Sequence, residues 1–217
     1  MLRAVLFDLD QTLLDRKRTF RHFIDDQYQR IALLQNIPYE QFVEDFTVLD
    51  DNGYGPKDRA YFQMLKKHGL DTSHAETLYK DFRGNYALCA QPYPDTHEVL
   101  QTLQKAGLRI GIITNGVTAT QQTKMERIGI LPYTEVALVS EAEGIKKPNP
   151  EIFHRALNRM GLTAQEAIFV GDHPENDVRA AQHVGMKAVL KLDGDDVDTS
   201  FADHVISDLR SLLPLVL

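Results

Sequence analysis

The chain has 217 residues, 43% of them hydrophobic and 25% charged, a composition typical of a globular protein with a sizeable core. Its formal net charge of −7 argues against a nucleic-acid polymer as partner, because nonspecific binding of that kind requires a basic face. No apolar run approaches the roughly 18 residues that a membrane span needs, and a single cysteine, Cys89, fits a reducing compartment. We therefore expect a cytoplasmic protein with no membrane partner.

The first stretch with a clear pattern is residues 5–15, VLFDLDQTLLD. Its apolar run ends abruptly at two carboxylates, Asp8 and Asp10, as is typical of a strand buried on both faces of a parallel sheet. Side chains two apart on a strand point the same way, so these carboxylates share a face and repel each other. A metal ion, a lysine or a shared proton would relieve that repulsion. The alternative is an acidic loop in which Asp8 or Asp10 caps a helix.

Residues 16–88 carry helical periodicity and no strand signal. The pattern predicts four helices. The first covers residues 20–36, the second begins at Pro38, the third ends near Gly69, and the fourth begins at Ser73, where Ser-x-x-Glu resembles a capping box. A turn-rich segment at residues 51–59 separates the second helix from the third. This block is expected to be an inserted α-helical cap.

From residue 91 onward helices and strands alternate. Strands are expected at residues 109–114, 135–140, 167–170, 187–190 and 205–206, with helices at 96–106, 118–128, 151–160, 175–184 and from 208. Such alternation predicts an α/β fold with a doubly wound, Rossmann-like parallel sheet. The strand at residues 4–9 must join this sheet, since the helical block offers it no partner. We thus expect a core domain of residues 1–15 and 89–217, and a cap of residues 16–88.

Polar residues follow four of the predicted strands. They are Asp8 and Asp10, then Thr114 and Asn115, then Lys146 and Lys147 in a loop, and last Asp172 with Asp177 five positions on. Each group alone has a plain structural explanation, as a helix-entry turn, a solvated loop or a helix cap. A doubly wound sheet, however, brings the carboxyl ends of its strands to one edge, where ligands bind. The coincidence therefore favours a catalytic site.

Together these segments resemble the four motifs of the haloacid dehalogenase superfamily, in its phosphatase branch with a helical cap after the first strand. The motifs are DLDQT (residues 8–12), IITN (112–115), KKP (146–148) and GDHPEND (171–177). Gln11 is a departure, because Gly or Asn is commoner there, and it should change the turn more than the chemistry.

The resemblance implies a Mg²⁺-dependent phosphatase that hydrolyses a small phosphorylated metabolite through an aspartyl-phosphate intermediate. In this reading Asp8 is the nucleophile, and Asp10 is first the general acid and then the general base. Lys147, rather than Lys146, would neutralise the nucleophile and the phosphate. Positioning and charge neutralisation are what phosphoryl transfer chiefly requires.

The remaining roles also follow from the resemblance. Thr114 and the backbone N–H of Asn115 would bind phosphoryl oxygens. The carboxylates of Asp8 and Asp172, with the Asp10 carbonyl, would hold Mg²⁺, an all-oxygen set that suits a hard cation. Asp177 would orient Lys147 or a water on the metal. The neighbouring histidine, residue 173, is expected to be a loop residue rather than a ligand.

Several alternatives stay open at this point. A sugar-phosphate mutase would keep both aspartates, whereas a true dehalogenase lacks an acid at the position of Asp10. A phosphonate-cleaving enzyme would need a Schiff-base lysine in the cap, for which Lys57, Lys66 and Lys67 are available. A receiver-like binding module is disfavoured, because its phosphoacceptor lies on a later strand than its acidic pair. Substrate specificity is expected in the loop at residues 53–59, where Lys57 and Arg59 either clamp an anionic tail or are solvated; the oligomeric state is unknown.

Overall fold

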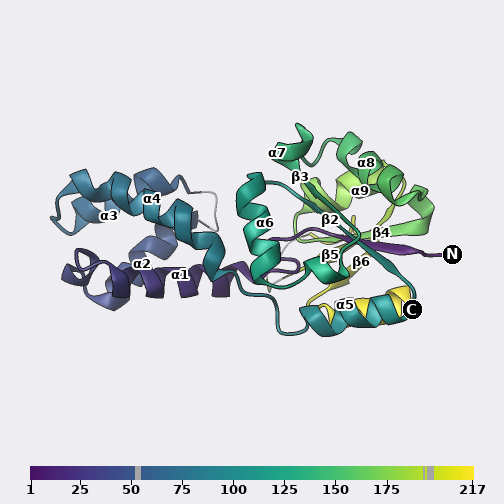
Figure 1. Ribbon diagram of the computed structural model, residues 1–217, viewed down its shortest axis with the longest axis horizontal. Helices are drawn as coiled ribbons and strands as arrows, with labels where there is room; N and C mark the ends of the chain where they lie inside the picture. Colours follow the sequence, from purple (N-terminus) through teal and green to yellow (C-terminus); the bar gives the residue numbers. More distant parts are fainter. Residues whose placement is uncertain (52–54, 193, 195–197) are drawn as a thin grey trace. The chain divides into compact units, whose positions relative to one another are not determined.

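The computed structural model describes residues 1–51, 55–192, 194 and 198–217 (Figure 1). The chain forms two compact units. We call Met1–Arg16 with Ala90–Leu217 the core unit, and Lys17–Cys89 the helical unit. Within the described ranges, none of the helices has the length and apolar character needed to cross a membrane.

A six-stranded parallel sheet with the strand order β3-β2-β1-β4-β5-β6 forms the centre of the core unit. Its strands are β1 (Ala4–Phe7), β2 (Arg109–Thr114), β3 (Val136–Val139), β4 (Ala167–Gly171), β5 (Lys187–Lys191) and β6 (His204–Ile206). The four residues of β1 are fully buried between β2 and β4, as expected for a central parallel strand. The predicted α/β fold with a doubly wound parallel sheet is confirmed.

The first strand is shorter than its apolar pattern predicts. It ends at Phe7, and the backbone carbonyl of Leu9 already accepts hydrogen bonds from the N–H groups of Leu13 and Leu14. The chain thus turns sharply after Asp8, whose own N–H still donates to the carbonyl of Val170 at 2.9 Å.

Helices cover both faces of the sheet, as the doubly wound topology requires (Figure 1). One face packs against α5 (Thr96–Lys105) and α6 (Thr118–Arg127) through Val5 and Phe7 of the central strand. The opposite face packs against α8 (Pro150–Met160) and α9 (Ala180–His183). Two further short helices are α7 (Ser140–Glu143) and α10 (Leu213–Val216).

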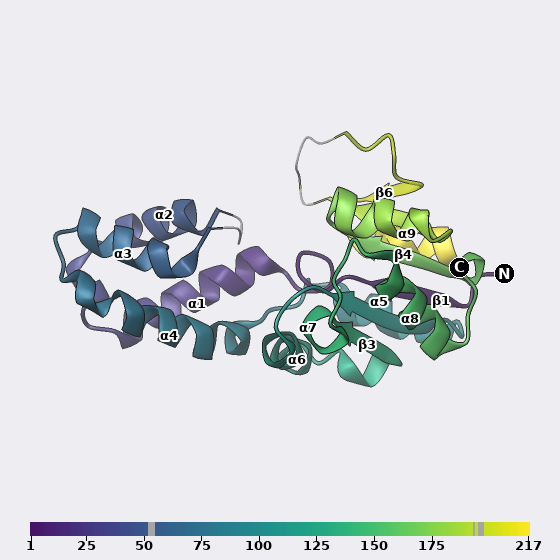
Figure 2. The same cartoon turned by 90° about the horizontal axis from the view of Figure 1, so that it is seen from above.

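In its described residues the helical unit is built on four α-helices, seen in purple to blue in Figure 2. They are α1 (Arg16–Arg30), α2 (Tyr39–Asp50), α3 (Lys57–Lys67) and α4 (Ala75–Asn85). The first of them begins at Arg16, the last residue of the first of the two segments that make up the core unit. Aromatic side chains dominate their shared core, where the ring centroids of Phe46 and Tyr61 lie 4.6 Å apart. Such ring pairs add a directional preference to the burial of apolar area.

Two sequence predictions for this unit are wrong. The first helix ends at Arg30 instead of continuing through Asn36, and a separate 3₁₀ turn covers Leu34–Asn36. Ser73 does not form the predicted capping box with Glu76. The side chain of Asp71 instead accepts a hydrogen bond from the Ser73 N–H at 2.9 Å, and α4 begins at Ala75.

Lys57 is neither a solvated lysine nor a clamp held ready for an anion. Its Nζ lies 2.9 Å from the Asp50 carboxylate and donates to the backbone carbonyls of Asp50 and Gly55, so it ties the start of α3 to the end of α2. Arg59 is exposed on α3. Residues 53 and 54 of the predicted specificity loop lie outside the described residues.

Replacing Lys57 with alanine should therefore lower the free energy of unfolding by roughly 1–3 kcal/mol, the usual penalty for depriving a buried polar group of a partner. The Asp50 side chain is only 4% exposed and would remain buried with one cation fewer. Urea unfolding measures the effect. Arg59→Ala is the matched control and should change stability by less than about 0.5 kcal/mol; equal effects of the two substitutions would contradict this account.

Candidate active site

A buried network of charged side chains lies at the carboxyl end of β1. Lys147 Nζ donates to Asp8 Oδ1 at 2.5 Å and to Asp177 Oδ1 at 2.6 Å. The side chains of these three residues are each less than a tenth exposed. They come from three segments that follow β1, β3 and β4, which are brought together by the sheet topology. The hydroxyl of Thr12 also lies 3.4 Å from Asp8 Oδ2.

The turn after β4 places Asp177 beside the lysine. His173 caps the π-helix Pro174–Arg179 by accepting hydrogen bonds from the backbone N–H groups of residues 175 and 176 on its Nδ1, and its own N–H donates to Asp177 Oδ2. Gly171 makes room for this arrangement. A Cβ atom at that position would lie only 2.5 Å from the Asp177 carboxyl carbon, closer than any real contact.

Asn115 binds the backbone of Lys147 rather than pointing at a ligand. Its Nδ2 donates to the Lys147 carbonyl and its Oδ1 accepts from the Lys147 N–H, both at 2.9 Å. The loop that carries the lysine is thereby fixed to the end of β2. Lys146, in contrast, is exposed. Thr114, the last residue of β2, is buried.

Asp10 lies near this group but has partners of its own. Lys124 Nζ contacts both oxygens of its carboxylate, at 2.8 and 3.0 Å, and Gln121 Nε2 donates to Oδ2 at 2.9 Å. The sequence reasoning missed both residues, which belong to α6. A signal was present, because positions 121, 124, 125 and 128 form the inward stripe of that helix and two of them are polar.

The pKa values of the carboxyl groups in this site differ sharply. Burial raises the pKa of Asp8 to about 7, against the opposing effect of Lys147, and Asp177 raises it further. Burial, with the charges of Asp8 and Asp177, raises the pKa of Asp172 to about 8. Burial also acts on Asp10, but Lys124 and the hydrogen bonds from α6 hold the pKa of that carboxyl below its usual value. Negative charge is therefore under-compensated around Asp8 and Asp172.

The residues present fit a hard divalent cation. Carboxylate oxygens of Asp8, Asp172 and Asp177 all lie within 4.8 Å of one another, and an all-oxygen set of this kind suits Mg²⁺. The sequence reasoning expected Asp8, the Asp10 carbonyl and Asp172 as ligands, with Asp177 behind them. In this structure Asp177 also belongs to the acidic group, although one of its oxygens already binds Lys147.

Mg²⁺ should raise the thermal unfolding temperature more at about pH 8 than at about pH 5. The raised pKa values of Asp8 and Asp172 mean that the folded metal-free protein holds protons that the unfolded chain releases above about pH 4. Metal-free stability therefore falls as the pH rises from about 4 to about 8, and the ionised carboxylates that result are the form that binds a cation.

The measurement is differential scanning fluorimetry with and without Mg²⁺ at both pH values and constant ionic strength. Asp172→Asn is the control variant, and it should lose most of the Mg²⁺-dependent gain. A gain that is equal at the two pH values, or that survives in Asp172→Asn, would contradict the assignment of these carboxylates to a metal site.

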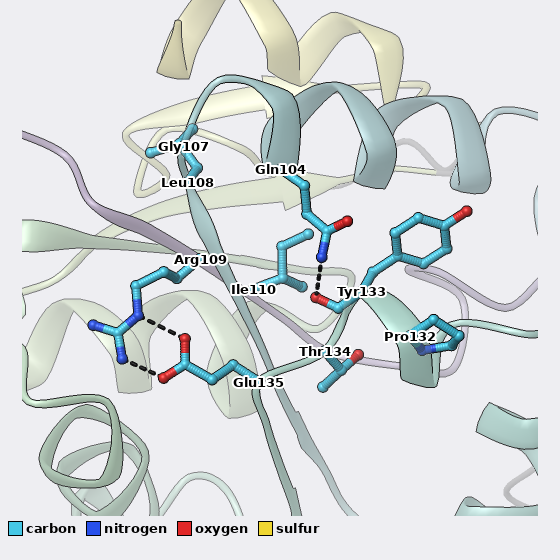
Figure 3. A pocket seen from close by; sticks show the side chains of 9 residues that line it. All are labelled: Gln104, Gly107, Leu108, Arg109, Ile110, Pro132, Tyr133, Thr134 and Glu135. Atoms are coloured by element: carbon cyan, nitrogen blue, oxygen red, sulfur yellow. Dashed lines mark hydrogen bonds and ion pairs between the residues drawn. The ribbon is translucent and has the colours of Figure 1, made fainter.

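A separate hollow of about 450 Å³ lies at the opposite, amino-terminal edge of β2 and β3 (Figure 3). Its charged lining residues, Arg109 and Glu135, are already paired with each other, and Gln104 donates to the Tyr133 carbonyl. None of the predicted site residues lines this hollow. The chemistry-bearing groups are therefore those at the carboxyl edge.

Known proteins are similar to this chain over most of its length. The family model of haloacid dehalogenase-like hydrolases matches residues 2–185. A glyceraldehyde 3-phosphate phosphatase from Methanocaldococcus jannaschii is 32% identical over 100% of this chain and 97% of its own. The solved structure of a HAD phosphatase from Thermococcus onnurineus has a TM-score of 0.68 and 29% identity, covering 99% of this chain and 97% of that one. A 2-haloacid dehalogenase from Pseudomonas syringae pv. Tomato DC3000 has a TM-score of 0.63 and 30% identity, covering 100% and 98%. The chain belongs to the haloacid dehalogenase-like hydrolase family.

Proposed function

We propose that this protein is a Mg²⁺-dependent phosphatase that hydrolyses a small phosphorylated metabolite through an aspartyl phosphate on Asp8. The protein is a hydrolase of phosphate esters, in keeping with its relatedness to a glyceraldehyde 3-phosphate phosphatase. The observation that carries the finer proposal is the buried Asp8 carboxylate, 2.5 Å from Lys147, with Asp10 two positions further along the chain. The composition and the single cysteine support a cytoplasmic location.

The reaction proceeds in two balanced half-reactions. First, a carboxylate oxygen of Asp8 attacks phosphorus, the bond from phosphorus to the ester oxygen breaks, and Asp10, which enters the step protonated, gives that oxygen its proton; the carboxylate that this leaves is the form that Lys124 stabilises. Second, Asp10 takes a proton from water, whose oxygen attacks phosphorus and breaks the bond to Asp8. One ester and one water thus become one alcohol and one inorganic phosphate, and both aspartates return to their starting states.

The other residues stabilise charge and hold geometry. Lys147 neutralises the nucleophile and the transferred phosphoryl group, while Thr114 and the backbone N–H of Asn115 bind its oxygens. Asp8, Asp172 and the Asp10 carbonyl would hold Mg²⁺, which when bound supplies further neutralisation of the phosphoryl oxygens. Asp177 fixes Lys147 by the contact of 2.6 Å.

The activity test is a panel of phosphate monoesters that includes glyceraldehyde 3-phosphate, phosphoglycolate and sugar phosphates, assayed by phosphate release. We expect activity with Mg²⁺, loss of activity in EDTA, and recovery when Mg²⁺ is returned. Because a 2-haloacid dehalogenase is among the similar structures, a 2-haloacid is included and halide release is measured. Halide release without phosphatase activity, or full phosphatase activity after rigorous metal removal, would overturn the proposal.

A further inference from the structure

Two side chains of α6, Gln121 and Lys124, point at Asp10 from positions three residues apart. That spacing puts them on one helix face, so α6 presents both to the same carboxylate. They are strongly buried, with Gln121 2% and the Lys124 side chain 9% exposed. The Asp10 side chain is 28% exposed. The helix therefore covers one side of the carboxylate and leaves another side open.

The contacts fix the plane of this carboxylate. Lys124 Nζ binds both oxygens and Gln121 Nε2 binds one of them, so a rotation of the carboxylate would break at least one donor contact. Proton transfer demands that kind of control, because a catalytic group displaced by about 1 Å can lose roughly 10² in rate. Neither side chain lies in the four motifs of the sequence.

Gln121 also joins Asp10 to the phosphate-binding threonine. Its Nε2 donates to Thr114 Oγ1 at 2.6 Å as well as to Asp10. The threonine oxygen accepts that bond, so its own hydrogen points elsewhere and is available as a donor. Gly116 leaves the space for this amide, since a Cβ there would lie 2.9 Å from the Gln121 side chain, and its φ of 152° disfavours other residues.

We propose that Gln121 and Lys124 are positioning residues of the reaction. Lys124 holds the Asp10 carboxylate in the orientation for proton exchange with the ester oxygen and water. Gln121 does the same and, in addition, sets the Thr114 hydroxyl as a donor to the phosphoryl group. This inference rests on the proposed function, because it assigns Asp10 the general acid–base role.

A double-mutant cycle with Asp10→Asn tests the inference. Lys124→Met should lower kcat/KM for an alkyl phosphate by roughly 10²-fold, and for para-nitrophenyl phosphate by less than about tenfold, since that leaving group needs no proton. In the Asp10→Asn background, Lys124→Met should change kcat/KM by less than about twofold, because the group it positions is already gone. Lys124→Gln provides a second, polar variant should the methionine variant fold poorly.

Gln121→Leu should give a different signature. Its loss disturbs Thr114 as well as Asp10, so it should lower kcat/KM for the alkyl and the aryl ester alike, and part of the effect should persist in Asp10→Asn. Gln122→Leu, an exposed neighbour on α6, and Lys105→Met, an exposed lysine at the end of α5, are the matched controls and should leave both substrates unchanged.

The outcomes distinguish a failure of the positioning role from a failure of the proposed phosphatase function. Suppose that wild type hydrolyses phosphate esters but Lys124→Met lowers kcat/KM for both substrates by the same factor, with and without Asp10. The positioning role is then overturned, while the proposed phosphatase function is retained. If wild type releases no phosphate from any ester with Mg²⁺, the proposed function fails and the catalytic role of α6 fails with it. Thermal unfolding of each variant shows that the rates compare folded proteins.

Discussion

Asp8→Asn is expected to abolish phosphate release from every ester. An amide cannot form the acyl phosphate, so the loss should reach the detection limit rather than a fixed factor. The same substitution should leave the thermal unfolding temperature without Mg²⁺ within a few degrees of wild type, because the neutral amide avoids the penalty of burying a charged carboxylate. Phosphate release at saturating substrate, with Mg²⁺ present, measures the first effect.

The companion variant for this experiment is Asp10→Asn. It should retain measurable turnover, reduced by roughly 10²- to 10⁴-fold, the usual contribution of a general acid–base. It should be impaired less with an aryl phosphate, whose leaving oxygen needs no proton. Wild-type rates in Asp8→Asn together with a dead Asp10→Asn would show that the nucleophile has been placed on the wrong residue.

Lys147→Ala is expected to lower kcat/KM for every substrate by a common factor of roughly 10²–10³, the range seen when one donor to a developing charge is removed. The charge that Lys147 neutralises lies on the transferred group itself, so the identity of the alcohol should not matter. The substitution should also lower the free energy of unfolding by roughly 3–5 kcal/mol, because Asp8 and Asp177 would remain buried without their shared cation.

Lys146→Ala is the matched control for this prediction. It removes the same charge from the adjacent position, but Lys146 is exposed, so stability should change by less than about 0.5 kcal/mol. Comparing the two variants by urea unfolding and by kcat/KM on three esters separates site chemistry from net charge. Similar losses in both variants, or a strong dependence of Lys147→Ala on the alcohol, would contradict the assignment.

Prediction from the sequence worked well for the core unit because a parallel sheet with crossover helices has a regular, recognisable sequence pattern. Apolar runs followed by polar residues predicted the strands β1, β2, β3 and β4 and the polar residues in the segments after them, among them Asp8 and Lys147. The order of the strands in the sheet did not need to be known, since any doubly wound arrangement brings these ends to one edge. The local pattern and the global topology therefore pointed to the same residues.

Prediction was weaker where a local signal had several structural outcomes. The polar residues Ser73 and Asp71 both precede α4, and the choice of the cap depends on the backbone conformation between them. The Lys57 side chain could not be placed, because its partner Asp50 belongs to another helix and the pairing depends on how α2 and α3 pack. Hydrophobic periodicity carries no information about such contacts.

The partners of Asp10 were missed for a further reason. Gln121 and Lys124 occupy inward positions of α6, but a polar residue in an apolar stripe does not by itself identify its target. The target lies more than a hundred positions earlier in the chain, and only the fold brings the two segments together. The polar interruptions in that stripe were nevertheless visible as an anomaly.

The crowding around Gly171 has a consequence for variant-effect maps and for directed evolution of this enzyme. Glycine to alanine is ordinarily among the mildest changes, and alanine is the usual neutral probe of a position. At residue 171 the added methyl carbon would lie 2.5 Å from the Asp177 carboxyl carbon, so the carboxylate that binds Lys147 would have to move. The position has no side chain to remove, so a scan that credits function only to side chains would overlook it. A library that aims to alter substrate preference should hold this residue constant, because any side chain there would displace the Asp177 carboxylate.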